Sequence, residues 1–153
     1  MPNDALQLMK QIPLFRQLGE GELNLVWAMG QELGLPAGYS LETPADQPPV
    51  LWILLEGRAD ATFPTVEDGH TTIYAPEVWG ASTLVPPFRS PGLAVTATPC
   101  RVLRIYAREV RMLAEQSPRL GVRLYEELAT RFAGRFRGLL ERPLSERMAP
   151  PAS

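Results

Sequence analysis

The stretch VWGASTLVPPFRSPGLAVTA, residues 78–97, is the part of the sequence that decides the fold. It begins as a strand end, turns at a glycine, and passes through small and hydroxyl-bearing residues that suit one short helical turn. Two prolines end this turn, and an apolar strand pattern returns at residues 93–95. Backbone N–H groups of a short helix entered through glycine can hold an anion, and a nearby arginine can supply the countercharge. The pattern therefore predicts a phosphate-binding turn made by Gly80, Ala81, Ser82, Thr83, Arg89 and Ser90; a proline-rich surface loop with a solvated arginine is the alternative.

The bulk composition is that of one folded domain. A chain of 153 residues with 45% hydrophobic residues and three tryptophans can bury a core without a metal or a disulfide. Its single cysteine, Cys100, cannot form an internal disulfide, and no apolar run approaches the roughly 18 residues of a membrane span. The N-terminus also lacks the basic and apolar pattern of a secretion signal. These features predict a soluble, cytoplasmic protein.

Charge is unevenly distributed along the chain. Residues 1–106 contain six Lys or Arg against eleven Asp or Glu, whereas residues 107–153 contain nine against six. A basic C-terminal part could contact nucleic acid or an acidic partner. Glutamates are interleaved with the arginines there, and this mixture favours a solvated helical face.

The apolar pattern predicts helices in residues 3–31 and strands in residues 32–106. Leu23, Val26 and Trp27 recur at helical spacing, whereas from residue 32 onward short apolar runs alternate with turn residues. Residues 50–55 are apolar enough to form a buried strand, and Glu56-Gly57 predicts a hairpin turn into the next strand. Six to eight strands at this spacing predict an antiparallel roll, either closed or two-layered.

Helices are predicted again in residues 107–142, followed by a flexible tail at residues 143–153. From Arg119 to Glu141 an apolar residue recurs every four positions: Leu124, Leu128, Phe132, Phe136 and Leu140. Such a wide apolar stripe needs cover from other surfaces. We expect the roll to cover one side and a second copy of the helix to cover the other, giving a homodimer. Packing on its own roll alone is the alternative.

In this order, the helices, the roll, the anion-binding turn and the long helix resemble the cyclic nucleotide-binding domain. That domain is the sensor module of the catabolite-activator and FNR family, of the regulatory subunits of cyclic-AMP-dependent kinase, and of nucleotide-gated channels. The matching residues are spread over the chain: Pro13-Leu14-Phe15 with Leu18, Ala37-Gly38 with Leu41, Ile53 to Gly57, Trp79-Gly80, and Cys100 to Ile105. The resemblance implies a mainly β fold with flanking α-helices. Its core would be an antiparallel β-roll, like a double-stranded β-helix or jelly roll, and a long C-terminal helix would complete one domain over residues 1–142.

The ligand cassette departs from the family pattern. In the family, a glycine is followed at once by a glutamate that binds the ribose hydroxyl, and about ten residues later by an arginine that pairs with the cyclic phosphate. Gly80 matches the glycine, Ala81 stands where the glutamate should be, and Arg89-Ser90 matches the arginine pair with a small local gap. Pro91-Gly92 interrupts the strand that usually follows. Since a hydrogen bond to a charged partner contributes about 1.5–3 kcal/mol, the missing glutamate should weaken a cyclic nucleotide roughly ten- to a hundredfold. An inward Arg89 would leave a weak or altered site, and an outward one would leave none.

These residues predict a non-enzymatic regulatory protein, a sensor or adaptor with an altered nucleotide pocket. Two alternatives stay open: a ligand-free structural or protein–protein interaction module, and a sensor of cyclic AMP, cyclic GMP or another small anionic ligand. One histidine, His70, is too few for the metal centre of cupins, a related jelly-roll class. Cys100, in an alternating strand, fits a small core residue better than a nucleophile. We therefore expect no catalytic residue, no metal and no cofactor, with a cyclic nucleotide as the candidate ligand.

The expected partners follow from the same reasoning. Transcription factors of the family carry a helix-turn-helix domain after the long helix, and the 11 residues that follow Arg142 are too few for one. We expect no direct DNA binding and no membrane contact. A homodimer through residues 119–141 is the expected assembly, and the identity of any further protein partner stays open.

Overall fold

The computed structural model describes residues 1–64 and 69–141 of the chain. Three helical segments come first: α1 (Asn3–Lys10), the short 3₁₀ helix η1 (Pro13–Phe15) and α2 (Glu20–Ala28). The strands follow: β1 (Gln31–Leu35), β2 (Val50–Glu56), β3 (Arg58–Thr62), β4 (His70–Tyr74), β5 (Glu77–Trp79), β6 (Leu93–Thr96) and β7 (Cys100–Tyr106). A second short helix, η2 (Ala81–Leu84), lies between β5 and β6, and α3 (Ala107–Gln116) and α4 (Pro118–Leu140) end the described chain. The predicted tail at residues 143–153 lies outside the described residues.

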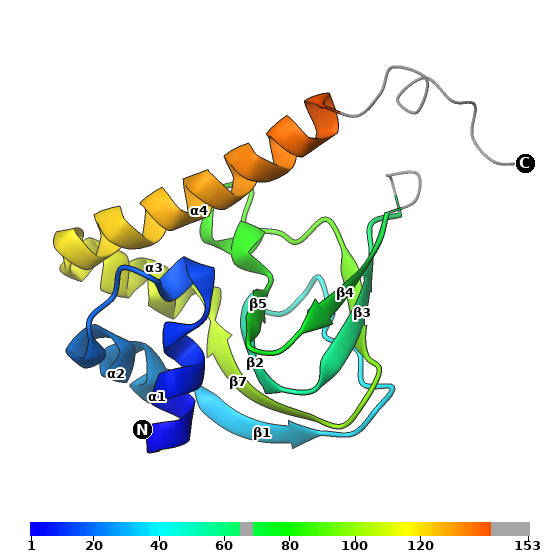
Figure 1. Ribbon diagram of the computed structural model, residues 1–153, viewed down its shortest axis with the longest axis horizontal. Coiled ribbons are helices and arrows are strands. Elements are labelled where there is room, and N and C mark those ends of the chain that lie inside the picture. Colours follow the sequence, from blue (N-terminus) through cyan, green and yellow to red (C-terminus); the bar gives the residue numbers. More distant parts are fainter. Residues whose placement is uncertain (65–68, 142–153) are drawn as a thin grey trace, which may run out of the picture.

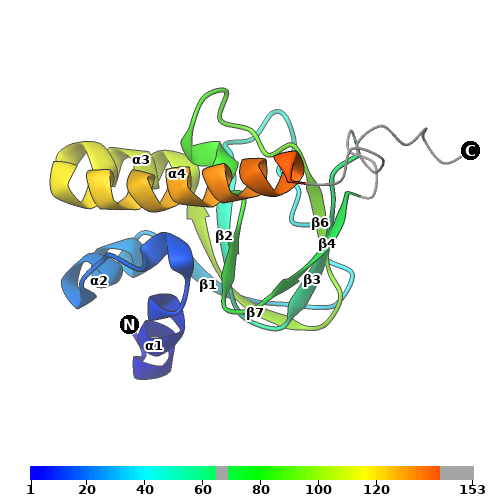
Figure 2. The same ribbon diagram turned by 45° about the horizontal axis from the view of Figure 1, so that its top comes forward.

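The strands form two antiparallel sheets that face each other as a roll. One sheet has the strand order β1-β7-β2-β5 and the other has the order β4-β3-β6. The two sheets enclose one apolar cluster, and a second cluster lies between the four-stranded sheet and the helices. Figures 1 and 2 show the helices gathered on one side of the roll, with α4 running past β5 and η2. The predicted fold class, an antiparallel roll with flanking helices and a long last helix, is confirmed.

Burial on both faces explains the dense apolar run in β2. Leu51, Ile53 and Leu55 belong to the cluster beneath the helices, whereas Trp52 and Leu54 belong to the cluster inside the roll. Side chains alternate between the two faces of a strand, so a strand that is covered on both faces needs apolar residues at successive positions. The Trp52 indole N–H donates a hydrogen bond of 2.9 Å to the carbonyl of Leu41, which satisfies its polar atom inside the roll.

The predicted hairpin at Glu56-Gly57 is wrong. β2 pairs with β5 and β7, whereas β3 pairs with β4 and β6, so the chain passes from one sheet to the other at this point. Gly57 has φ of 101°, and a Cβ atom there would lie 2.6 Å from the carbonyl oxygen of Pro99. Gly57 does turn the chain, but the strands on its two sides belong to different sheets.

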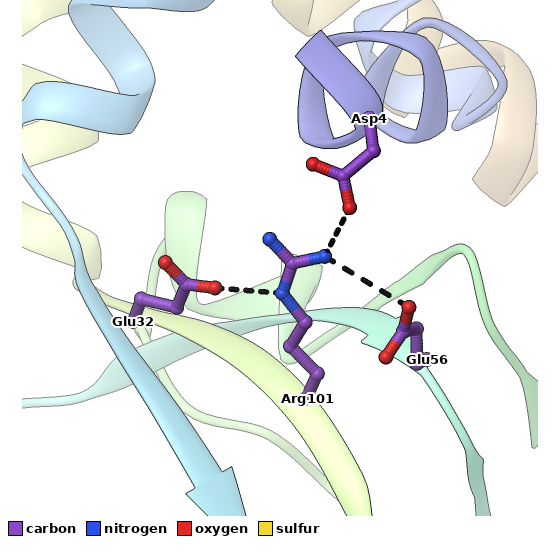
Figure 3. A network of polar contacts seen from close by, with 4 residues as sticks. All are labelled: Asp4, Glu32, Glu56 and Arg101. Atoms are coloured by element: carbon purple, nitrogen blue, oxygen red, sulfur yellow. Dashed lines mark hydrogen bonds and ion pairs between the residues drawn. The ribbon is translucent and has the colours of Figure 1, made fainter. Parts of the chain in front are cut away.

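Two arginines attach the N-terminal helices to the rest of the domain. Arg101 of β7 donates to Asp4 of α1 at 2.5 Å and to Glu32 of β1 at 2.6 Å, and it lies 3.8 Å from Glu56 (Figure 3). The hydrogen bond from Arg101 lowers the pKa of Asp4.

Arg123 of α4 donates to the Glu22 carboxylate at 2.5 Å and to the backbone carbonyl of Gln17 at 3.0 Å. Both partners precede the roll in sequence, so α4 is fixed against the N-terminal segment. None of the helices in the described residues is long and apolar enough to cross a membrane.

Candidate functional site

Gly80 is the residue that brings β5 into η2. Its φ is 93°, and a Cβ atom at this position would lie 2.9 Å from the backbone oxygen of Val50. A residue with a side chain would be strained here and would also collide with neighbouring backbone. The glycine therefore permits the short helix to start directly against the edge of the roll.

Side chains from both C-terminal helices bind the end of η2. Arg111 of α3 donates to the carbonyl of Thr83 at 3.0 Å, and the Tyr125 hydroxyl of α4 donates to the carbonyl of Leu84 at 2.9 Å. The buried hydroxyl of Thr83 is itself bonded to the carbonyl of Gly80. These bonds satisfy carbonyl groups that the end of a helix leaves free, and they couple the cassette directly to α3 and α4.

A cavity of about 90 Å³ lies beside the start of η2. The cassette contributes Gly80, Ala81, Ser82, Ser90 and Pro91, the roll contributes Phe63, Val78 and Trp79, and α4 contributes Arg131, Phe132 and Arg135. This small cavity therefore lies where roll, cassette and last helix meet.

The loop that leads into β6 packs against the aromatic wall of this cavity. A Cβ atom on the buried Gly92 would lie 2.7 Å from the Phe63 ring and 2.8 Å from the Trp79 ring. The two rings are themselves in contact, with centroids 5.8 Å apart. The backbone at Gly92 is therefore in direct contact with the rings, and no side chain fits between them.

Arg131 and Glu77 form an ion pair at the edge of the small cavity. Their charged atoms are 2.9 Å apart, and the side chains are 18% and 25% exposed. Glu77 also accepts a hydrogen bond of 2.8 Å from the backbone N–H of Val78. The guanidinium of Arg131 thus already has a carboxylate partner within the domain.

Arg89 lies apart from Ala81 and Ser82. It is exposed, and together with Thr83 it lines a larger groove of about 510 Å³. Neither residue lines the small cavity. Gly80 and Ser90 line both hollows. The structure thus places the six residues of the predicted site on one loop, but divides them between two hollows.

Sequence reasoning missed the residues that complete this region. Phe63 lies just after the residues of β3, and Arg111, Tyr125 and Arg131 lie in the helical region predicted for residues 107–142. One signal was present in the sequence: Arg111, Tyr125 and Arg131 are polar residues on the predicted helices that precede and contain the apolar stripe. Their spacing does not indicate which part of the roll they contact, because that depends on how the helices dock.

Comparison with solved structures identifies the fold. The N-terminal domain of a transcriptional regulator from Streptomyces coelicolor A3(2) matches with a TM-score of 0.67 and 20% identity, over 84% of this chain and 94% of that one. The Thermus thermophilus catabolite activator protein matches with a TM-score of 0.65 and 20% identity, over 82% of this chain and 59% of that one. The regulatory domain of Toxoplasma gondii PKA, crystallised with cAMP, matches with a TM-score of 0.57 and 17% identity, over 69% of this chain and 41% of that one.

No protein-family model matches the sequence, and no significant match was found among curated proteins. The likeness therefore lies in the three-dimensional arrangement, with TM-scores of 0.57 to 0.67 at 17 to 20% sequence identity. The chain has the fold of the cyclic nucleotide-binding domain of catabolite-activator and kinase regulatory proteins.

Proposed function

We propose that the chain is a non-enzymatic regulatory domain, a sensor or adaptor, whose cassette does not hold cyclic AMP in the usual way. The fold supports the regulatory part of this proposal. The matching structures are, by name, a catabolite activator, a domain of a transcriptional regulator and a kinase regulatory domain.

The main support for an altered pocket is the contact between Gly92 and the rings of Phe63 and Trp79. The cavity at the junction of roll, cassette and last helix measures about 90 Å³, and the loop lines it through Ser90 and Pro91, whereas Gly92 lines the outer groove. Pockets that bind small molecules usually measure roughly 300–1,000 Å³. A nucleotide would have to displace the loop or the rings before it could enter.

The charges around the small cavity support the same conclusion. A buried phosphate needs a cation or several donors to compensate for its lost hydration. Ala81 is buried and has no polar side chain, Arg89 lines the other hollow, and Arg131 is already paired with Glu77. Arg135, the remaining cation of the lining, extends from α4 and not from the cassette. Neither of the two side chains that hold the nucleotide in the family therefore has an equivalent facing this cavity.

The bonds between the cassette and the helices favour an adaptor over a sensor. A ligand can shift a conformational equilibrium only when it binds the two states with different affinities. Here the protein's own Arg111 and Tyr125 already hold α3 and α4 to η2, through hydrogen bonds of 3.0 and 2.9 Å. The helices are thus fixed without a ligand, although a sensor of a different anionic ligand stays the second candidate.

Titration calorimetry with cyclic AMP and cyclic GMP tests the proposal. We expect no binding heat with either nucleotide up to millimolar concentration, for the wild type and for Arg89→Ala alike. Binding in the micromolar range that Arg89→Ala abolishes would refute the altered pocket and establish an ordinary cyclic nucleotide sensor.

We also propose that α4 mediates a homodimer. Its first half is buried against its own domain through Leu120, Leu124 and Leu128. Its second half exposes large apolar side chains: Phe136 is 61%, Leu139 51% and Leu140 53% exposed. A helix with an apolar face that its own domain does not cover is a suitable surface for a second copy.

Light scattering on matched leucine variants tests the dimer. Leu139 in α4 and Leu25 in α2 are both 51% exposed. We expect a wild-type dimer that Leu139→Glu converts to a monomer and that Leu25→Glu leaves intact. A monomeric wild type at high micromolar concentration would refute the assembly. The cytoplasmic location stays a prediction.

A further inference from the structure

The groove of about 510 Å³ on the Arg89 side of the cassette has the size of a small-molecule site. One wall is the loop between β1 and β2, where Leu41, Pro44 and Gln47 line it, and the other is the segment between η2 and β6. Arg111 of α3 lines it as well. The groove thus combines apolar walls with a few polar side chains, as ligand sites commonly do.

Arg111 is held in place within this groove. Its guanidinium lies 4.3 Å from the centre of the Phe88 ring, at the distance of a cation–π contact, and one of its nitrogens donates to the Thr83 carbonyl. A guanidinium has five N–H donors. The contact with Thr83 uses one of them, so the fixed group retains donors for a ligand.

The charges lining the groove are unbalanced. Arg89 and Arg111 contribute two positive charges and Glu42 one negative charge. Within residues 1–64 and 69–141, neither arginine has a carboxylate within 4.0 Å, whereas Arg101 has three and Arg123 and Arg131 have one each. The lining therefore has an excess of one positive charge, which matches a ligand with a single negative charge.

Phe88 presents a flat apolar surface in this groove. It is 37% exposed, and its φ of 62° makes it the one non-glycine residue with positive φ in the described chain. Residues other than glycine, asparagine and aspartate rarely adopt this backbone conformation, and such outliers concentrate at binding sites. Its ring, braced by Arg111, can pack against a flat apolar group.

We propose that this groove binds a small carboxylate with a flat apolar body. The carboxylate pairs with Arg111 and Arg89, since the planar guanidinium fork matches the two carboxylate oxygens. The apolar body lies against Phe88 and the proline-bearing loop that contains Pro44. This site differs from the small cavity beside α4, because Pro44, Phe88, Arg89 and Arg111 line the groove and not the cavity, although Trp79, Gly80 and Ser90 line both hollows.

Nuclear magnetic resonance titration with three simple probes tests the site. Benzoate carries the ring and the charge, benzamide carries the ring without the charge, and acetate carries the charge without the ring. A ligand of this size should bind with a dissociation constant on the order of 1 mM. We expect benzoate to shift the amide signals of Gln47 and Phe88, and to bind at least about tenfold more tightly than benzamide or acetate.

Substitutions then assign the charge partner. We expect Arg111→Gln and Arg89→Gln each to weaken benzoate binding about tenfold. Arg108→Gln is the matched control, because Arg108 also lies over an aromatic ring, that of Tyr106, but does not line the groove. Arg111→Gln loses the hydrogen bond to Thr83 and could unfold for that reason. Arg89→Gln still tests the proposal in that case, because Arg89 is exposed and makes no such bond.

The proposal would be overturned by the absence of any shift with benzoate at about 10 mM, ten times the expected dissociation constant. Equal binding of benzamide would overturn it, and so would unchanged affinity in the Arg89→Gln and folded Arg111→Gln variants. Shifts confined to Phe63 and Phe132 would place the ligand in the small cavity and would also overturn it. Failure of the altered-pocket proposal appears separately, as cyclic nucleotide binding in calorimetry.

Discussion

Replacing Gly92 by alanine tests directly whether the loop before β6 fills the pocket. An added methyl group would lie 2.7 Å from Cε1 of Phe63 and 2.8 Å from Cη2 of Trp79. Ordinary contacts between carbon atoms are about 3.5–4.0 Å. The methyl group therefore cannot be accommodated unless the loop or both rings move by most of an ångström.

The expected cost follows from the packing around the rings. Insertion of one methyl group into a well-packed site usually costs about 1–3 kcal/mol. Two rings are in the way, so relief by a single rotamer change is unavailable, and we expect the upper half of that range. Gly34→Ala is the control, since an added methyl group at Gly34 in β1 would have no neighbour within 4 Å. Its effect on the free energy of unfolding should stay within about 0.5 kcal/mol.

Urea unfolding monitored by far-ultraviolet circular dichroism measures both variants. A double-mutant cycle adds Phe63→Ala, which removes two of the three nearest atoms. In that background Gly92→Ala should cost at least about 0.5 kcal/mol less, because residues in contact are not additive. If Gly92→Ala has the same effect as Gly34→Ala, or if the cycle shows no coupling, the loop does not pack on the rings and the argument for a filled pocket fails.

Two further outcomes are expected on stability. Gly121→Ala in α4 should destabilise the folded protein by about 1–3 kcal/mol, because the added Cβ would lie 2.6 Å from the backbone oxygen of Ala114. Gly134→Ala in the same helix has open space around the added Cβ and should stabilise the protein by about 0.5–1 kcal/mol. If urea unfolding gives changes of the same sign for both variants, this expectation is wrong. The hydrogen bond from Arg101 lowers the pKa of Asp4 below its usual 3.8, so the folded state favours the carboxylate, and its contribution is complete above about pH 5 and is lost as the pH falls through the lowered pKa. The difference in unfolding free energy between wild type and Asp4→Asn should therefore shrink as the pH is lowered from about 5, and a constant difference would show that the ion pair does not contribute.

The sequence predicts the order of the elements well because each element has a local signal. Residues 50–55 are apolar without interruption, and they form the strand that is buried on both faces. The glycine at position 80 and the small residues after it predict a short helical turn, and η2 occupies residues 81–84. Such signals depend on neighbours within a few positions, which a single sequence displays directly.

Strand pairing was harder to predict, because it depends on distant partners. Glu56-Gly57 has the composition of a hairpin turn, yet the strands on either side pair with β7 and with β6, which lie more than 30 residues further along the chain. Turn residues indicate a change of direction and do not indicate which strand lies alongside. The same limit applies to Tyr125, whose hydroxyl reaches the carbonyl of Leu84 across 41 positions.

The candidate site depends most strongly on Pro91 and Gly92, the two residues that follow Arg89-Ser90. Pro91-Gly92 delays the return to strand, so that β6 starts only at Leu93. Because a proline fixes its backbone and a glycine adds no side chain, the loop can lie flat on the aromatic rings. The same excursion leaves Arg89 in the outer groove, away from Ala81 and Ser82. Filling of the inner cavity and exposure of the outer groove therefore have one local cause, and a variant that removes Pro91-Gly92 should alter both hollows together.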